Sequence, residues 1–122
     1  MKNKGIILIC DHDDDHLNEV RNALENEGFS IDVLNDASEL IPRAIRSRPG
    51  VIVVNPEMQA FNEEDVCKNI ITDMDVPAII MIDKNATSRA SIGDCTVQHV
   101  LTKPVNISNL LYVISQQLTI NQ

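Results

Sequence analysis

The chain has 122 residues, 43% of them hydrophobic and 2% aromatic, which predicts a single domain over residues 1–122 with an aliphatic core. Its formal net charge of −8 opposes contact with a phosphate backbone, so we expect no binding to nucleic acid. No apolar run approaches the ~20 residues needed to cross a bilayer, and the N-terminus has no signal-peptide core. These features favour a cytoplasmic protein without a membrane partner.

Three cysteines stand at scattered positions, Cys10, Cys67 and Cys95. An odd count without the regular spacing of a disulfide framework is typical of reduced thiols. We therefore expect all three to be free and structural.

The chain begins with a predicted strand, a helix and a second strand. Ile6–Cys10 is continuously apolar, as expected for a parallel strand covered on both faces. Asp14 is expected to cap the helix that follows, and Gly28 to end it. Ser30–Leu34 mixes polar and apolar residues, which predicts a strand at one edge of the sheet.

A second helix, a third strand and a third helix follow. Pro42 near the beginning of the second helix is expected to delay or kink its start. Val51–Val54 is apolar throughout and predicts a buried strand, and Asn62 is expected to cap the third helix.

The last part of the chain contains two more strands. Ala78–Ile82 predicts a buried strand, and Gln98–Thr102 predicts a strand at the other edge of the sheet. Ala86–Gly93 between them is the weakest predicted helix, because its Thr and Ser residues favour caps and turns. Asn106 is expected to cap a final helix, whose apolar residues recur at helical spacing over Ile107–Leu118.

This alternation predicts an α/β protein with a flavodoxin-like (βα)5 three-layer sandwich and a parallel sheet of order 2-1-3-4-5. In such a sheet, ligands bind beyond the carboxyl ends of the strands, where strands 1 and 3 diverge. The polar residues that follow strands at this edge are Asp11, His12, Asp13, Asn55, Asp83 and Lys103.

From Ile7 to Leu118 the chain resembles the receiver domain of two-component response regulators. The most specific matches are the acidic step after the first strand and the residues Asp36, Pro49, Val76-Pro77 and Thr102-Lys103-Pro104. The resemblance implies a phosphorelay module. In such a module carboxylates hold Mg²⁺, an aspartate accepts the phosphoryl group, a hydroxyl binds it and a lysine pairs with its charge.

Carried over residue by residue, this pattern is incomplete. Asp11 matches the first acidic residue and Lys103 matches the lysine. His12 stands where the family usually has a metal-binding carboxylate, Asn55 stands at the phosphoacceptor position, and Ile82 stands at the hydroxyl position.

Other switch positions also depart from the family pattern. Asp83 occupies a position that the family usually keeps small, and Val100 replaces the aromatic residue that reports phosphorylation. Gln59 and Glu63 stand where Pro and Gly are usual. Asn55 taken by itself could be a single engineered change of the acceptor residue. The joint loss of the acceptor, the metal carboxylate, the hydroxyl and the aromatic residue instead predicts a receiver that is not phosphorylated.

We therefore expect a signalling module of the pseudo-receiver type that has no catalytic residues, binds Mg²⁺ weakly or not at all and acts through protein–protein interaction. Lys103 and Asp11 are expected to form an ion pair across the pocket. The expected interaction face comprises the fourth helix, the fifth strand and the fifth helix, with Val100 and Tyr112, and would bind a signalling protein or a second copy of the chain.

Two alternatives remain open. The chain could be a small metal- or ligand-binding flavodoxin-like protein, since His12 and His16 have the spacing of ligands on one helical face. It could also be a receiver phosphorylated at a non-standard residue, Asp11 or Asp13.

Overall fold

The computed structural model of the chain describes residues 5–86 and 89–120. The strands and helices are, in order, β1 (Ile6–Cys10), α1 (Asp14–Asn26), β2 (Ser30–Leu34), η1 (Ala37–Glu39), α2 (Leu40–Ser47), β3 (Val51–Val54), α3 (Glu63–Val66), η2 (Cys67–Thr72), β4 (Ala78–Ile82), β5 (Ser91–Ile92), β6 (Cys95–Thr96), β7 (His99–Thr102) and α4 (Ile107–Ile120). η1 is a 3-10 turn that leads into α2, and η2 is a π-helical continuation of α3.

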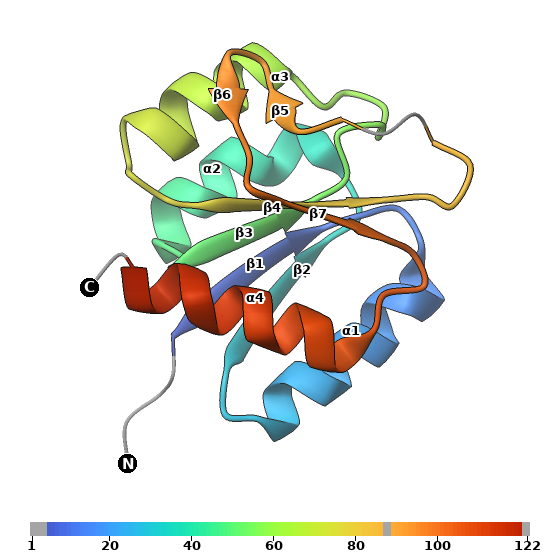
Figure 1. The fold of residues 1–122 in the computed structure, drawn as a ribbon. Helices are drawn as coiled ribbons and strands as arrows, with labels where there is room; N and C mark the ends of the chain where they lie inside the picture. The colour runs from blue at the N-terminus through green and yellow to red at the C-terminus, as the bar shows by residue number, and fades with distance from the viewer. Residues whose placement is uncertain (1–4, 87–88, 121–122) are drawn as a thin grey trace.

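Five strands form one parallel sheet of order β2-β1-β3-β4-β7, in which β7 is the fifth strand of the predicted order. This confirms the predicted flavodoxin-like α/β fold. Figure 1 shows α1 and α4 on one face of the sheet, and α2 and α3 on the other.

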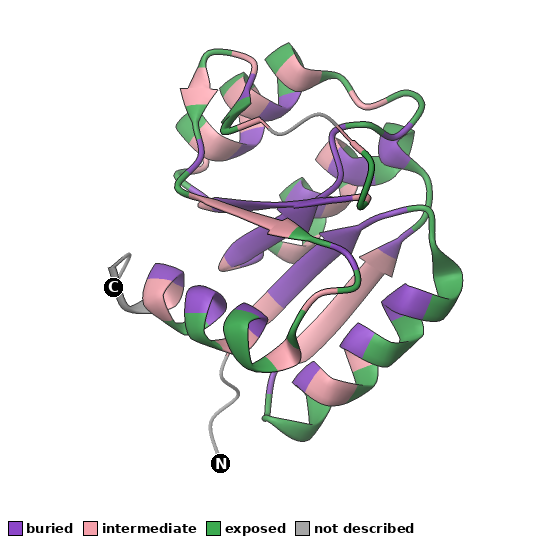
Figure 2. Cartoon of the chain, turned by 45° about the vertical axis from the view of Figure 1, so that its right-hand side comes forward, coloured by how far each residue is buried: buried purple, intermediate pink, exposed green. Residues whose placement is uncertain are grey.

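Side chains of the central strands alternate between two hydrophobic cores, one on each face of the sheet. In β1, Ile7 and Ile9 pack with α1 and α4, whereas Leu8 and Cys10 pack with α2, α3 and η2. β1, β3 and β4 are consequently almost fully buried, as Figure 2 shows, while the helices expose their outer faces.

Local capping explains where the helices begin. The side chain of Asp13, and not that of the predicted Asp14, accepts a hydrogen bond from the backbone N–H of His16 at 3.1 Å. Asp13 has extended backbone angles, whereas Asp14 is already helical, so Asp13 is the residue that can cap. The predicted caps Asn62 and Asn106 are confirmed, each accepting a backbone N–H at 3.0 Å.

The start of α2 is delayed, as predicted from the position of Pro42. The side chain of Asp36 caps the preceding 3-10 turn, and α2 begins at Leu40, with Pro42 in its first turn, where a missing N–H costs little.

The helix predicted over Ala86–Gly93 is wrong for the described residues of this segment. Ser91–Ile92 and Cys95–Thr96 instead pair as a short antiparallel hairpin, which we call the β5–β6 hairpin. Gly93 has a φ of +58°, a value that favours a turn over a helix, and Ile92 is buried in the core beside α3. Residues 87 and 88 lie outside the described residues.

The cysteines also differ from the prediction. Cys67 and Cys95 form a disulfide, and Cys10 is a buried free thiol. The expectation of three free thiols was therefore wrong for two of them, because the hairpin brings together cysteines that are 28 residues apart. Among residues 5–86 and 89–120, no helix has the length and apolar composition needed to cross a membrane.

Candidate functional site

Backbone hydrogen bonds that continue beyond the strand ends bring the predicted site residues together. The N–H of Asp11 donates to Leu34, the N–H of Asn55 donates to Cys10, and the N–H of Lys103 donates to Ile82, at 3.0, 3.1 and 2.8 Å. Asp11, Asn55 and Lys103 therefore converge at the carboxyl edge of the sheet, although up to 92 positions separate them in the sequence.

Asp11 is the centre of this site. It is fully buried, and its Oδ1 accepts hydrogen bonds from the His12 backbone N–H at 2.7 Å and from Asn55 Nδ2 at 3.1 Å. Its Oδ2 accepts from Lys103 Nζ at 2.7 Å, so both carboxylate oxygens are engaged within the protein. The predicted ion pair between Lys103 and Asp11 is present.

Lys103 is held by two carboxylates. Its Nζ also lies 2.7 Å from Oδ1 of Asp83, and its side chain is 7% exposed. Burial lowers the pKa of Lys103, but hydrogen bonds and attraction to Asp11 and Asp83 outweigh burial and raise it above its ordinary value. The lysine therefore remains charged and is neutralised inside the pocket.

Asp83 is the more exposed of the two carboxylates that contact Lys103. The hydrogen bond from Lys103 holds the pKa of Asp83 below its ordinary value, although partial burial opposes this. Its Oδ2 lies 3.5 Å from Nε2 of His12, whose side chain is half-exposed. The role of Asp83 as a partner of Lys103 was missed in the sequence, where its position directly after β4, next to the lysine strand, was the available signal.

Asn55 uses both ends of its amide. Besides the bond from Nδ2 to Asp11, its Oδ1 accepts the backbone N–H of Glu57 at 3.0 Å, and the side chain is fully buried. The position that would carry a nucleophilic carboxylate is therefore filled by an amide fixed in one orientation.

The remaining predicted residues have other surroundings. Asp13 caps α1 at the surface, and Ile82 is buried in the core on the α3 side of the sheet. Val100 is half-buried against the same core, so it contributes less exposed apolar surface than expected. Tyr112 on α4 is 62% exposed, as predicted, and its hydroxyl accepts a hydrogen bond from Gln116 Nε2 at 2.8 Å.

The residues present do not fit Mg²⁺. This hard cation requires several free oxygen ligands, but Asp11 has both oxygens engaged, Asn55 Oδ1 is occupied, and His12 offers an imidazole. The two-histidine alternative also lacks the required geometry, because His16 Nε2 accepts the N–H of Val105 at 3.3 Å whereas His12 lies beside Asp83. The part of the chain that the structure describes contains no group of three or more His, Cys, Asp or Glu side chains placed to hold a metal.

A sheet of this order with these residues at its carboxyl edge defines a receiver-type signalling fold. The family model described as "Response regulator receiver domain" matches residues 7–115, so the chain belongs to the response regulator receiver domain family. Receiver domains are signalling modules of two-component systems.

Curated relatives share this region of the chain. Response regulator MprA of Mycobacterium leprae (strain TN) is 27% identical over 107 residues, which are 86% of this chain and 47% of the relative. MprA of Mycobacterium sp. (strain KMS) is 25% identical over 86% of this chain and 46% of its own length. The chain thus spans about half the length of these relatives.

Solved structures match over nearly the whole chain. A response regulator from Desulfuromonas acetoxidans has a TM-score of 0.80 at 26% identity, over 94% of this chain and 97% of its own. A putative response regulator from Chloroflexus aurantiacus has a TM-score of 0.81 at 16% identity, over 97% and 99% of the two chains, and at that identity supports the fold alone.

Proposed function

We propose that this chain is a phosphorylation-incompetent receiver domain that acts through protein–protein interaction in a two-component or phosphorelay pathway. The observation that carries the proposal is the bond between the amide of Asn55, at the phosphoacceptor position, and the carboxylate of Asp11.

The chemistry of the acceptor position supports this reading. An amide oxygen is a very poor nucleophile for phosphorus, and the oxygen of Asn55 already accepts the N–H of Glu57. Ile82 offers no hydroxyl to bind a transferred group. The chain therefore lacks both the group that would attack and one that would hold the product.

The charges of the pocket also disfavour a phosphoryl group. Asp11 and Asp83 each lie 2.7 Å from Nζ of Lys103, so an incoming anion would compete with two carboxylates for the lysine. Asp83 and His12 lie 3.5 Å apart at the exposed side of the site, where a phosphodonor would have to approach. These contacts link Asp11, Lys103, Asp83 and His12 to one another.

Partner binding is assigned to the surface formed by β7, α4 and the β5–β6 hairpin, which stands where a fourth helix was expected. Tyr112 on α4 is the exposed anchor of this surface. A signalling protein and a second copy of the chain are the two occupants proposed, because an interface residue of this kind serves either.

Titration with Mg²⁺ and then beryllofluoride, followed by the backbone amide spectrum of the ¹⁵N-labelled chain, tests the state of the pocket. We expect no saturable change at the amides of Asp11, Asn55 or Lys103 up to ~10 mM Mg²⁺, because their side chains are already paired. Saturable changes at all three amides would show that the pocket accepts the metal and a phosphoryl mimic, which would contradict the proposal.

A further inference from the structure

A disulfide ties the β5–β6 hairpin to the helix formed by α3 and η2. Cys67 begins η2, Cys95 begins β6, and their Cα atoms are 5.6 Å apart. Both residues keep partial solvent exposure, which places the disulfide near the surface of the domain. We propose that Cys67–Cys95 is a reversible redox modification site that takes low-molecular-weight thiols as its reductant and controls how firmly the hairpin is held.

Glu63 makes a second, non-covalent connection between the helix and the hairpin segment. Glu63 lies one turn before Cys67, and its Oε1 accepts the backbone N–H of Gly93 at 3.0 Å. Its Oε2 accepts Arg89 Nη1 at 2.5 Å. The Gly93 bond, followed by the Arg89 bond, keeps the pKa of Glu63 below its ordinary value despite partial burial. These two bonds do not involve the sulfur atoms, so we expect reduction to loosen the hairpin without unfolding the domain.

The turn of the hairpin rests directly on the helix. A Cβ atom at Gly93 would lie 3.1 Å from the carbonyl oxygen of Glu63 and 3.5 Å from Cβ of Cys67. Ile92, the preceding residue, is fully buried in the core beside α3. A change in the covalent link is therefore transmitted into a packed segment.

The redox step is an ordinary thiol–disulfide exchange. A thiolate attacks Sγ of Cys67, and Cys95 leaves as a thiolate beside the hydroxyl of Thr72, whose oxygen lies 3.7 Å from Sγ of Cys95. A second thiol attacks the mixed disulfide and releases Cys67. Two external thiols are oxidised to one disulfide, and the protein gains two electrons and two protons. Oxidised glutathione reverses the reaction.

The third cysteine does not interfere with this exchange. Cys10 is buried in β1, with its Sγ 3.7 Å from Sδ of Met58. Burial, followed by repulsion from Asp11 and Asp36, raises the pKa of its thiol to about 12. Cys10 is therefore a protonated and inaccessible thiol that does not act as a resolving cysteine.

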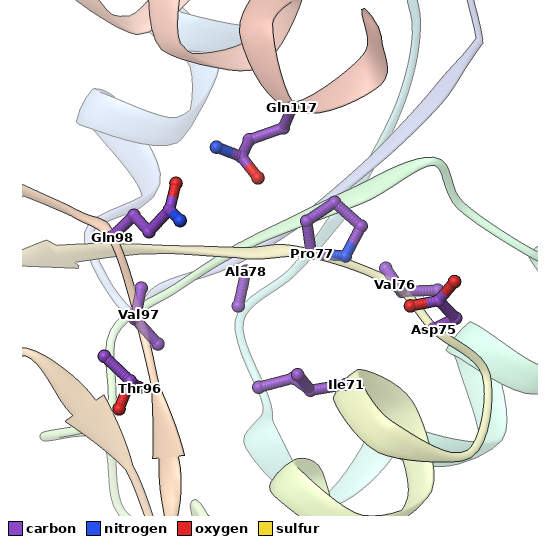
Figure 3. Close-up of a pocket in the computed structure, with 9 residues that line it drawn as sticks. All are labelled: Ile71, Asp75, Val76, Pro77, Ala78, Thr96, Val97, Gln98 and Gln117. Atoms are coloured by element: carbon purple, nitrogen blue, oxygen red, sulfur yellow. The ribbon is translucent and has the colours of Figure 1, made fainter. Parts of the chain in front are cut away.

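The segment that follows Cys95 extends the effect beyond the hairpin. Thr96, Val97 and Gln98 line a cavity of about 240 Å³ at the amino ends of β4 and β7, at the edge of the sheet opposite to the one that carries Asp11. Figure 3 shows the side chain of Gln117 at this cavity, where its buried Nε2 has no hydrogen-bond partner among the described residues. This segment connects the disulfide to β7, the edge strand of the proposed partner surface. The idea that the redox state of Cys67–Cys95 serves as a signalling input in place of phosphorylation rests on the proposed function, whereas the exchange chemistry does not.

The test equilibrates the whole chain with mixtures of reduced and oxidised glutathione, traps free thiols by alkylation, and counts them by intact mass. Hydrogen exchange of residues 89–97 is measured on the same samples. We expect both states of the Cys67–Cys95 pair to be populated across the mixtures. Residues 89–97 should exchange about tenfold faster in the reduced protein, with β1 and β3 unchanged.

Two variants sharpen the test. The double variant Cys67→Ser, Cys95→Ser should match the reduced protein in every mixture, and Cys10→Ala should behave as the unmodified chain does. A disulfide that resists every glutathione mixture, or a reduction that leaves exchange of residues 89–97 unchanged, would overturn the proposal. A positive phosphorylation result would remove the proposed function but leave this exchange result standing.

Discussion

At the scale of single residues, Asn55 differs from an aspartate by an NH₂ group in place of one oxygen, and the buried pocket depends on that difference. In the Asn55→Asp variant, Oδ1 of Asp11 would keep the N–H of His12 but lose the Asn55 amide at 3.1 Å and face a second carboxylate. We expect this variant to be less stable by about 1–3 kcal/mol, because a buried carboxylate loses one of its donors and gains a like charge beside it. We also expect it to remain unphosphorylated by acetyl phosphate with Mg²⁺, because His12 and Ile82 are unchanged.

Urea denaturation and intact-mass measurement check the two parts of this expectation separately. Efficient phosphorylation of the single variant would show that the other departures from the receiver pattern matter little.

Lys103 is the residue whose loss should destabilise the site most. Replacing it with Met leaves the fully buried Asp11 without its cation, and breaking a buried pair in this way costs about 3 kcal/mol or more. Asp83→Asn should cost about 1 kcal/mol or less, because that carboxylate is 46% exposed. Urea denaturation of both variants at pH 7 gives the comparison. Equal losses would mean that the depth of burial does not set the strength of these two pairs.

Asp83 should also contribute to the dependence of stability on pH. Its folded pKa lies below its ordinary value, so its contribution is present above about pH 4 and is lost as the pH falls through the folded pKa. We therefore expect the free energies of unfolding of the unmodified chain and of Asp83→Asn to converge between pH 7 and pH 3. If the difference between the two free energies of unfolding stays constant over this range, the inferred contribution of the Asp83–Lys103 pair is excluded.

At the scale of elements, α4 presents the exposed Tyr112 beside the edge strand β7. We expect Tyr112→Glu to weaken self-association or partner binding by about tenfold or more, because a charged group replaces an interface anchor. Ile45→Glu is a matched control, since Ile45 is 58% exposed but lies on α2, on the other face of the sheet. Light scattering and partner pull-down measure the effect. If both variants behave as the unmodified chain does, the interaction surface lies elsewhere.

The local pattern of the sequence predicted most elements because each depends on neighbouring residues. Continuous apolar runs identified β1, β3 and β4, and Asn62 and Asn106 identified the starts of two helices. Ala86–Gly93 was misread because a helix expected from the repeating architecture outweighed its own turn-forming residues, including Gly93 with its positive φ.

The site was predicted in part. Asp11, Asn55 and Lys103 were found because each follows a strand that ends at the same edge of the sheet. The Asp83–Lys103 pair was missed although both residues directly follow neighbouring strands, β4 and β7. The Cys67–Cys95 disulfide was missed because its formation depends on the course of the connection between β4 and β7. Sequence spacing does not encode that course, and only the folded backbone reveals it.

At the scale of the whole molecule, the connection between β4 and β7 carries two sites that differ in chemistry. At the β4 end, Asp83 joins the buried charges of Asp11 and Lys103, and further along the hairpin is fixed by Glu63 and a disulfide. In the function proposed above, the first arrangement takes the place of the phosphoryl switch, and the second is the proposed site of redox control. The chain spans about half the length of its curated relatives, so these properties concern the receiver domain itself.

Phosphorylation incompetence is tested most directly by intact mass after incubation with acetyl phosphate and Mg²⁺. The unmodified chain is compared with a variant that carries His12→Asp, Asn55→Asp, Ile82→Thr and Asp83→Ala, which restores the metal carboxylate, the acceptor and the hydroxyl and removes the Asp83 carboxylate. We expect no mass gain in the unmodified chain and a gain of one phosphoryl group in the restored variant. A phosphoryl group on the unmodified chain, mapped to Asp11 or Asp13, would contradict the account.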